Sequence, residues 1–134
     1  MKTEADLGAS ADEVWELVGD FGGLVEALGA PVTTEGEAGV GQLRKIDMNG
    51  ATMVERLESI DPASRTISYS IQEGPLPVEG YVATMQVHEA GDGRSRVTWE
   101  ATFDPAGMAE ADVSNIVNAI FSGGLTALQG RFGA

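Results

Sequence analysis

The chain has 134 residues, 43% of them hydrophobic, and its 21 acidic and 8 basic residues give a net charge of −13. A surface this acidic repels nucleic acid and anionic membranes, because contacts to phosphate need lysine and arginine. With no cysteine and a single histidine, His88, the chain excludes disulfides, thiolate catalysis and zinc sites built from several cysteine or histidine ligands.

The first thirty residues predict a short strand followed by two short helices. Residues 2–7 form a weak strand candidate. Ser10 and Glu13 have the spacing of a capping box, in which the serine precedes the first helical residue and the glutamate lies three residues on. Gly19 ends this helix, and residues 21–28 predict a second one.

From about residue 32 to residue 103 the hydrophobic period changes to two, which is typical of strands. Alternation is clearest in the last three runs, where apolar side chains on one face alternate with polar side chains on the other. Residues that favour turns separate the runs. The sequence therefore predicts six antiparallel strands, near residues 32–37, 41–48, 51–61, 65–72, 80–88 and 95–103.

The last segment returns to a helical period, with one apolar stripe over about 20 residues. Gly123 and Gly124 interrupt the stripe, although each glycine costs up to about 1 kcal/mol relative to alanine inside a helix. The pair marks either a kink or a close approach of the helix to the sheet. A sheet with one apolar face must cover it, and the long helix is the natural cover. We therefore expect one α+β domain over residues 1–134, with a curved sheet of about seven strands.

Two charged residues stand on strand faces that are otherwise apolar. Arg44 and Glu55 each share a face with apolar neighbours, because residues two apart on a strand point the same way. Between their strands lie Asn49 and Gly50, the strongest short-range hairpin signal. If these two residues are the whole loop, Arg44 pairs with Glu55. The pair is either a structural ion pair or the polar centre of a ligand site.

The same rule, in which buried residues face buried residues, extends the pairing across the sheet. A loop at residues 62–64 pairs Glu55 with Ile71, and the same rule can pair Ile71 with Tyr81. A loop at residues 91–93 then pairs Tyr81 with Phe103. The result is one row of side chains on the inner face of the sheet. The row contains Arg44, Glu55, Ile71, Tyr81 and Phe103.

This row predicts a division of chemical roles. An adjacent arginine lowers the pKa of a carboxyl group, so we expect Glu55 to stay ionised and to act as a general base. Arg44 would hold an oxygen of the ligand, and Tyr81 would donate a hydrogen bond or relay a proton, unless Tyr81 is an ordinary core tyrosine. The remaining expected ligand contacts are apolar or aromatic: Met53, Leu57, Tyr69, Ile71, Met85, Trp99, Phe103, Ile116 and Ile120.

The order of elements resembles the helix-grip fold of the START-related, birch-pollen-allergen-like superfamily, often called SRPBCC. The run of residues 9–15, together with Asp20 and Phe21, is similar to the first-helix signature of its polyketide cyclase/dehydrase branch. The middle of the chain is similar to the plant lachrymatory factor synthases. The matching stretches are Glu55 to Leu57, Ile60 to Pro62, Arg65, Ser68 and Tyr69, Tyr81 to Thr84, Trp99, and Asp104 with Pro105.

The resemblance implies a cavity between the sheet and the C-terminal helix that binds a small hydrophobic ligand. In the synthases an arginine, a glutamate and a tyrosine serve a proton-transfer rearrangement, and the counterparts here are Arg44, Glu55 and Tyr81. Two alternatives stay open: a cofactor-free lyase, isomerase or cyclase that uses these three residues, and a structural or partner-binding accessory protein. We expect no cofactor, no metal and no nucleic-acid partner.

The sequence also predicts where the protein works. No apolar run approaches the roughly 20 residues of a membrane span. The first residues lack the apolar stretch of a signal peptide, so we expect a cytoplasmic protein.

Overall fold

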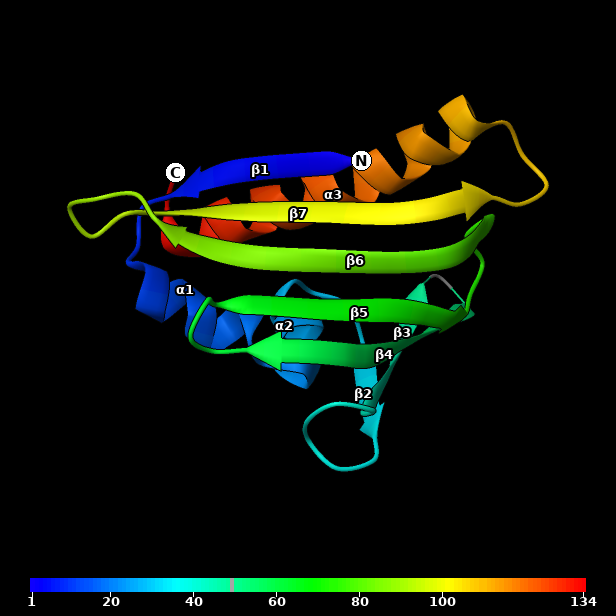
Figure 1. Cartoon of the computed structure of the whole chain (residues 1–134), viewed down its shortest axis with the longest axis horizontal. Helices are drawn as coiled ribbons and strands as arrows, with labels where there is room; N and C mark the ends of the chain where they lie inside the picture. The colour runs from blue at the N-terminus through cyan, green and yellow to red at the C-terminus, as the bar shows by residue number, and fades with distance from the viewer. Residues whose placement is uncertain (49) are drawn as a thin grey trace.

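The computed structural model describes residues 1–48 and 50–134, which form one seven-stranded antiparallel sheet and three helices (Figure 1). The strand order is β1-β7-β6-β5-β4-β3-β2, so the first strand pairs with the last. The α+β helix-grip architecture expected from the sequence is confirmed. Its elements are β1 (Lys2–Leu7), α1 (Ala11–Val18), α2 (Phe21–Ala27), β2 (Val32–Glu35), β3 (Leu43–Met48), β4 (Ala51–Asp61), β5 (Thr66–Glu73), β6 (Val78–Glu89), β7 (Ser95–Pro105) and α3 (Glu110–Phe132).

Side-chain caps set the start of both short helices. The hydroxyl of Ser10 accepts a hydrogen bond from the backbone N–H of Glu13 at 3.2 Å, which confirms Ser10 as the N-cap of α1. Asp20 caps α2 in the same way, since its Oδ1 accepts from the backbone N–H of Gly23 at 3.1 Å. Caps of this kind stabilise a helix by about 1 kcal/mol each.

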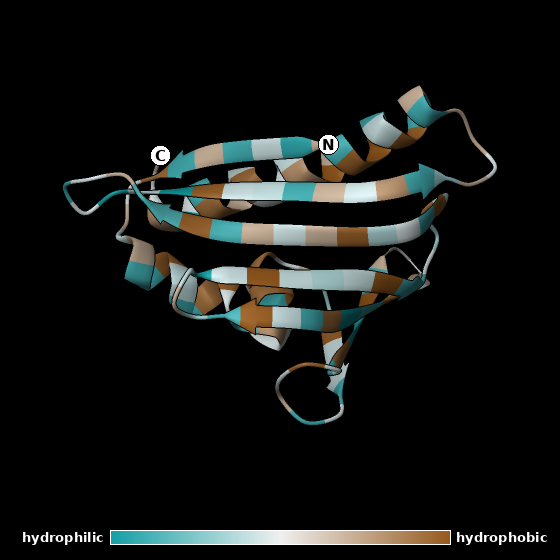
Figure 2. Cartoon of the chain, viewed as in Figure 1, coloured by the Kyte–Doolittle hydropathy of each residue, from teal (hydrophilic) through white to brown (hydrophobic). Residues whose placement is uncertain are grey.

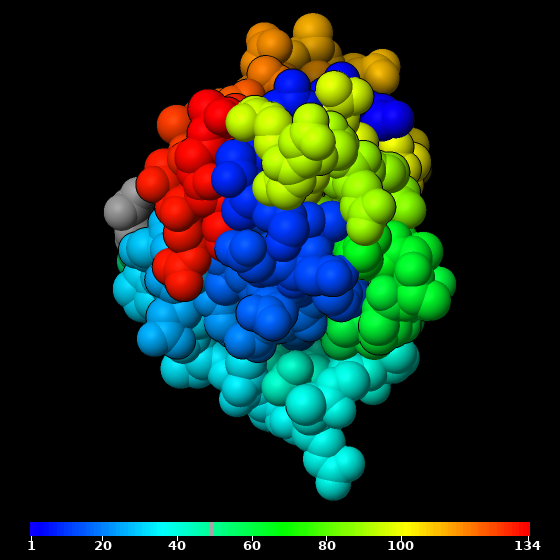
Figure 3. All heavy atoms as spheres, turned by 90° about the vertical axis from the view of Figure 1, so that its left-hand side faces the viewer, coloured from blue at the N-terminus to red at the C-terminus, as the bar shows by residue number. Residues whose placement is uncertain are grey.

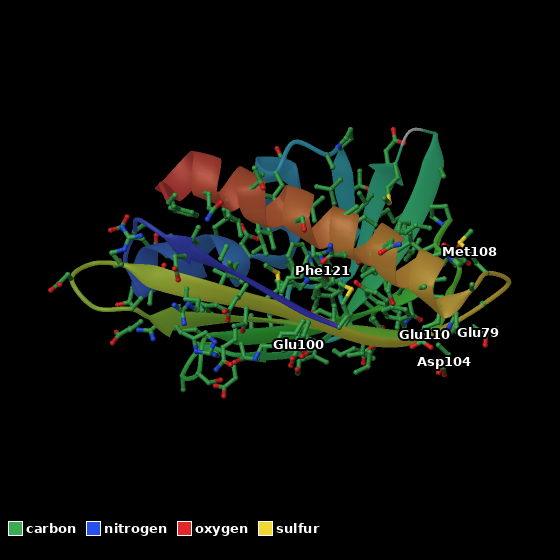
Figure 4. The ribbon with its side chains drawn as sticks, turned by 90° about the horizontal axis from the view of Figure 1, so that it is seen from above. Glu79, Glu100, Asp104, Met108, Glu110 and Phe121 are labelled. Atoms are coloured by element: carbon green, nitrogen blue, oxygen red, sulfur yellow. The ribbon has the colours of Figure 1, made fainter. Side chains whose placement is uncertain are left out.

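The helices cover the inner face of the sheet, and the main core lies between the two layers. Hydropathy alternates along the strands, as the banded colouring in Figure 2 shows. Figure 4 shows Phe121 beneath α3, between that helix and the sheet. Across the described residues, no helix combines the length and apolar character that a membrane span requires. The buried stripe of α3 consists of Val113, Val117, Phe121, Leu125 and Leu128.

The C-terminal end of α3 lies beside the turn that follows β1. In Figure 3 this end of the molecule faces the viewer, and the last residues, in red, lie next to blue spheres of the N-terminal segment. The backbone N–H of Gly8 donates to the carbonyl oxygen of Gly133 at 2.9 Å. This contact fixes α3 across the sheet at the end where β1 finishes.

The β3–β4 hairpin has the register that the sequence predicts. Arg44 pairs with Glu55, and Met48 pairs with Ala51. The predicted two-residue turn includes Asn49, which lies outside the described residues. Its second residue, Gly50, has a φ of 91°, in the left-handed region that glycine favours.

The β4–β5 connection differs from the predicted loop. Pairing begins at Asp61 and Thr66, so the loop is one residue longer than the expected 62–64. A register shift farther along β4 offsets the extra residue, and Glu55 faces Ile71 as predicted. Parity alone could not separate the two arrangements, because a bulge adds one residue on one strand only.

Candidate functional site

A pocket of about 230 Å³ lies between the inner face of the sheet, α2 and α3. Strands β3 to β7 each contribute to its floor, and Leu76 joins from the loop between β5 and β6. The volume of this pocket is below the roughly 300–1,000 Å³ of sites for drug-sized ligands. We therefore expect a ligand of one or two rings. Most of the wall is apolar. Its polar side chains are Arg44, Glu55, Tyr69, Tyr81 and Trp99.

Arg44 and Glu55 form a buried ion pair in the wall of this pocket. The Nε of Arg44 donates to Oε1 of Glu55 at 2.7 Å, and both side chains are 4% exposed. The Nη1 of Arg44 donates to the carbonyl oxygen of Phe21 at 2.9 Å. The guanidinium carbon also lies 4.1 Å from the ring centroid of Phe21 and 4.6 Å from that of Tyr69. Arg44 is therefore fixed by an ion pair, a carbonyl and two aromatic rings.

Glu55 uses one carboxylate oxygen for Arg44. Within residues 1–48 and 50–134, no group donates a hydrogen bond to its second oxygen, Oε2. Burial raises the pKa of Glu55 above its ordinary value, and the charge and hydrogen bond of Arg44 only partly oppose that rise. From the sequence alone, we expect the charge of Arg44 to outweigh burial and to lower the pKa of Glu55. In the structure burial outweighs Arg44, and the pKa is raised. Glu55 takes up a proton at a higher pH than an exposed glutamate does.

The raised pKa predicts a pH-dependent contribution of Glu55 to stability. The stabilisation is fully present below the unfolded pKa of about 4.3 and is lost as the pH rises through the higher folded pKa. We expect the unfolding free energy of wild type minus that of Glu55→Gln to fall across this window and then to stay constant. Urea denaturation from about pH 4 to about pH 8 measures the difference, and a flat profile would contradict the raised pKa.

Tyr69 and Trp99 form a second polar contact in the pocket wall. The Nε1 of Trp99 donates to the hydroxyl oxygen of Tyr69 at 3.0 Å. The indole also stacks on the ring of Phe121 from α3, with centroids 4.3 Å apart and planes 13° apart. Burial and the neighbouring charge of Glu55 raise the pKa of Tyr69. Its hydroxyl therefore keeps its proton at neutral pH.

Tyr81 stands between Ile71 and Phe103 in the predicted row. Burial, followed by the charges of Tyr69 and Glu55, raises the pKa of Tyr81, so this hydroxyl is also protonated at neutral pH. Its ring stacks on that of Phe103, with centroids 6.1 Å apart. The β5–β6 ladder ends at the pair of Ser70 and Val82, one step before the row would join β5 to Tyr81.

The pocket brings together eight of the twelve side chains that the sequence singles out. The other four lie elsewhere. Leu57 and Met85 are fully buried in the core, Phe103 packs on Tyr81, and Ile116 is half-buried on α3. The eight in the wall are Arg44, Met53, Glu55, Tyr69, Ile71, Tyr81, Trp99 and Ile120.

Sequence reasoning missed the contribution of α2 and its cap region. Leu24 and Leu28 line the pocket, and their spacing of four residues on a helix is a signal that could have placed them together. Phe21 covers Arg44 with both its ring and its carbonyl group. Of the two expected roles for the glycine pair, the structure shows a close approach: a Cβ at Gly124 would lie 2.6 Å from Cζ3 of Trp99.

Comparison with known proteins places this geometry in a family. Residues 1–133 match the family model described as polyketide cyclase/dehydrase and lipid transport. The carrot (Daucus carota subsp. sativus) isoallergen Dau c 1.0401 is 30% identical over 131 residues, covering 86% of this chain and 84% of the allergen.

Solved structures agree with the family model. An uncharacterised Bacillus thuringiensis protein is 34% identical, with a TM-score of 0.89, and the match covers 98% of this chain and 97% of that one. The Zhui aromatase/cyclase of a Streptomyces species shares the fold at 19% identity, with a TM-score of 0.78 over 98% of this chain and 91% of that one. The chain therefore belongs to the polyketide cyclase/dehydrase and lipid transport family of the SRPBCC superfamily.

Proposed function

We propose that the protein binds a small, mostly apolar ligand in the pocket between the sheet and α3, with Arg44 and Glu55 at the polar end. Membership of a family described by cyclases, dehydrases and lipid transport supports a ligand-binding, cyclase-like role. The observation that carries the proposal is a buried ion pair that stands in the wall of the pocket and is only partly hydrogen-bonded by the protein.

The partial bonding of this pair is the reason to prefer a ligand site over a purely structural ion pair. A buried ion pair stabilises a fold poorly, because desolvation offsets the attraction between the charges. Among the described residues, two hydrogen bonds engage Arg44, which carries five N–H groups, and one engages Glu55. A ligand with an acceptor oxygen and an acidic hydrogen would bond to a free N–H of Arg44 and to the second oxygen of Glu55, which would complete the hydrogen bonding of both groups.

A second candidate is a cofactor-free enzyme of the cyclase, dehydratase or isomerase type. The raised pKa of Glu55 favours it, because a general base works best when its pKa is near the operating pH. Glu55 Oε2 would take a proton from a carbon or oxygen of the substrate. Arg44 and Tyr81 would stabilise the negative charge that forms on the substrate oxygen.

Native mass spectrometry tests the binding proposal. We expect a 1:1 complex with a molecule retained from the cell, or with members of a panel of one- and two-ring ketones and phenols. Ala127 lines the pocket, so Ala127→Phe should fill it and abolish the complex. Ala119 is exposed on the same helix, so Ala119→Phe should keep the complex. Equal binding by both variants, or none by wild type, would contradict the proposal.

Glu55→Gln then separates the two candidates. The amide keeps the shape of the side chain and can still accept from Arg44, so both candidates predict retained binding. An enzyme should lose about 10²- to 10⁴-fold in turnover of a substrate, because the base is gone. A carrier should release the ligand chemically unchanged from wild type and from the variant.

A further inference from the structure

The hydrogen bond between Trp99 and Tyr69 has a direction that chemistry fixes. An indole N–H is only a donor, so the Tyr69 oxygen is the acceptor of the 3.0 Å bond. A hydroxyl that accepts from one partner keeps its own proton for another. Tyr69 therefore meets the pocket as a hydrogen-bond donor, and the indole N–H is already engaged.

The proton of Tyr69 is available to a ligand. The hydroxyl of Tyr81 is a second neighbour of the Tyr69 hydroxyl, and it lowers the pKa of Tyr69, as a donor to the Tyr69 oxygen does. Within the described part of the chain, both neighbours therefore act on the oxygen of Tyr69, and its proton is left for the ligand. Tyr69 is buried and lines the pocket together with Arg44 and Glu55. Buried donors are rarely left without a partner, so a molecule in the pocket that offers an acceptor oxygen gains a bond that a hydrocarbon cannot make.

The indole that sets this direction is itself held in place from two sides. Trp99 stacks on Phe121 at 4.3 Å, and the close approach of Gly124 limits movement on the side of α3. Its position therefore depends on the packing of the helix against the sheet. Tyr69 and Arg44 line the same pocket, and the guanidinium carbon of Arg44 lies 4.6 Å from the ring centroid of Tyr69.

We propose that Trp99 is a positioning residue that makes Tyr69 an obligate donor, so that the pocket selects ligands with a carbonyl or similar acceptor oxygen over hydrocarbons of the same shape. The proposal rests on the proposed function, because it specifies the ligand class of the same pocket. Arg44, which can only donate, adds to the preference. Among the described polar residues of the wall, Glu55 accepts hydrogen bonds when it is ionised, and the hydroxyl of Tyr81 can donate or accept.

A matched pair of probes tests the selection. 1-Tetralone and tetralin share two fused rings and differ by one carbonyl oxygen, and calorimetry gives the ratio of their dissociation constants. We expect wild type to prefer the ketone, and Tyr69→Phe to reduce the preference by about 2- to 10-fold, the value of one hydrogen bond. Trp99→Phe should also reduce the preference for the ketone, but it should change this preference little when Tyr69→Phe is already present.

The control is Trp15→Phe, the same substitution outside the pocket wall. It should leave the ratio of the dissociation constants of 1-tetralone and tetralin unchanged. Equal loss of affinity for both probes in Trp99→Phe would assign Trp99 a structural role only and overturn the proposal. A further reduction by Trp99→Phe in the Tyr69→Phe background would make Trp99 itself the ligand donor, which also overturns it. Failure of wild type to bind either probe would contradict the proposed function as well.

A measurement without ligand separates failure of the inference from failure of the proposed function. We expect the indole N–H proton resonance of Trp99 to move upfield in Tyr69→Phe, because its acceptor is removed. Trp15→Phe leaves one indole resonance and so assigns the signal. An unmoved resonance would show that Tyr69 does not accept this bond, which overturns the positioning role whatever the pocket binds.

Discussion

Replacing Arg44 with methionine is expected to lower the free energy of unfolding by about 3–5 kcal/mol, since it leaves a buried carboxylate without its partner. The variant also loses the hydrogen bond to the carbonyl group of Phe21 and the contact with the ring of Tyr69. Without the arginine the pKa of Glu55 rises further, so the deficit should shrink as the pH falls and Glu55 becomes neutral. Urea denaturation followed by circular dichroism measures both effects.

The double variant Arg44→Met with Glu55→Leu should recover most of this loss. Well-packed apolar residues in place of a buried ion pair are neutral or stabilising by about 1–4 kcal/mol in other proteins. Binding of oxygen-containing ligands should nevertheless be lost. If the double variant is stable and binds such ligands like wild type, the pair is structural.

Lys45→Met is the matched control on the same strand. Lys45 pairs with Glu35 at 2.9 Å, but the side chains are 44% and 63% exposed. Water and salt screen an exposed pair, so stability should hardly change. Equal losses in Lys45→Met and Arg44→Met would contradict the argument from burial.

Gly124→Ala is expected to destabilise the protein although alanine is the better helix former. The new Cβ would lie 2.6 Å from Cζ3 and 3.1 Å from Cη2 of Trp99. Trp99 cannot easily yield, because it stacks on Phe121 and donates to Tyr69. We expect overpacking to cost about 1–3 kcal/mol, more than the helix gains.

Gly123→Ala is the control for the helix itself. A Cβ at Gly123 meets nothing within 4 Å, so this variant should gain up to about 1 kcal/mol. Thermal unfolding should therefore move in opposite directions for two adjacent glycines. Trp99→Phe, with its smaller ring, should relieve much of the cost at Gly124. If both alanine variants raise the melting temperature equally, the close approach is not tight.

The β3–β4 hairpin could be predicted from the sequence because local signals agreed there. An Asn-Gly turn fixes which residues pair, and a period of two fixes which side chains share a face. Together they placed Arg44 opposite Glu55, and the ion pair followed. The β4–β5 loop was predicted one residue too short. A register shift offset the error, and Glu55 still met Ile71.

Other parts of the site depend on contacts that strand and helix periods do not encode. The bond from Trp99 to Tyr69 joins side chains 30 residues apart, on strands β7 and β5 that β6 separates. The placement of Phe21 over Arg44 requires the angle at which α2 meets the sheet. The balance that raises the pKa of Glu55 depends on how far burial excludes water, which no local pattern states.

The pairing of β1 with β7 has a consequence for the order of folding. Thr3 donates to the carbonyl oxygen of Trp99 at 2.8 Å across 96 residues of chain. Every other pair of neighbouring strands in the described sheet is consecutive in sequence. Contacts between distant residues form slowly, because the intervening chain must first be ordered. During synthesis the N-terminal strand waits for β7, and α3 follows every strand in the chain. The strand of this sheet that is synthesised first is thus among the last to join it.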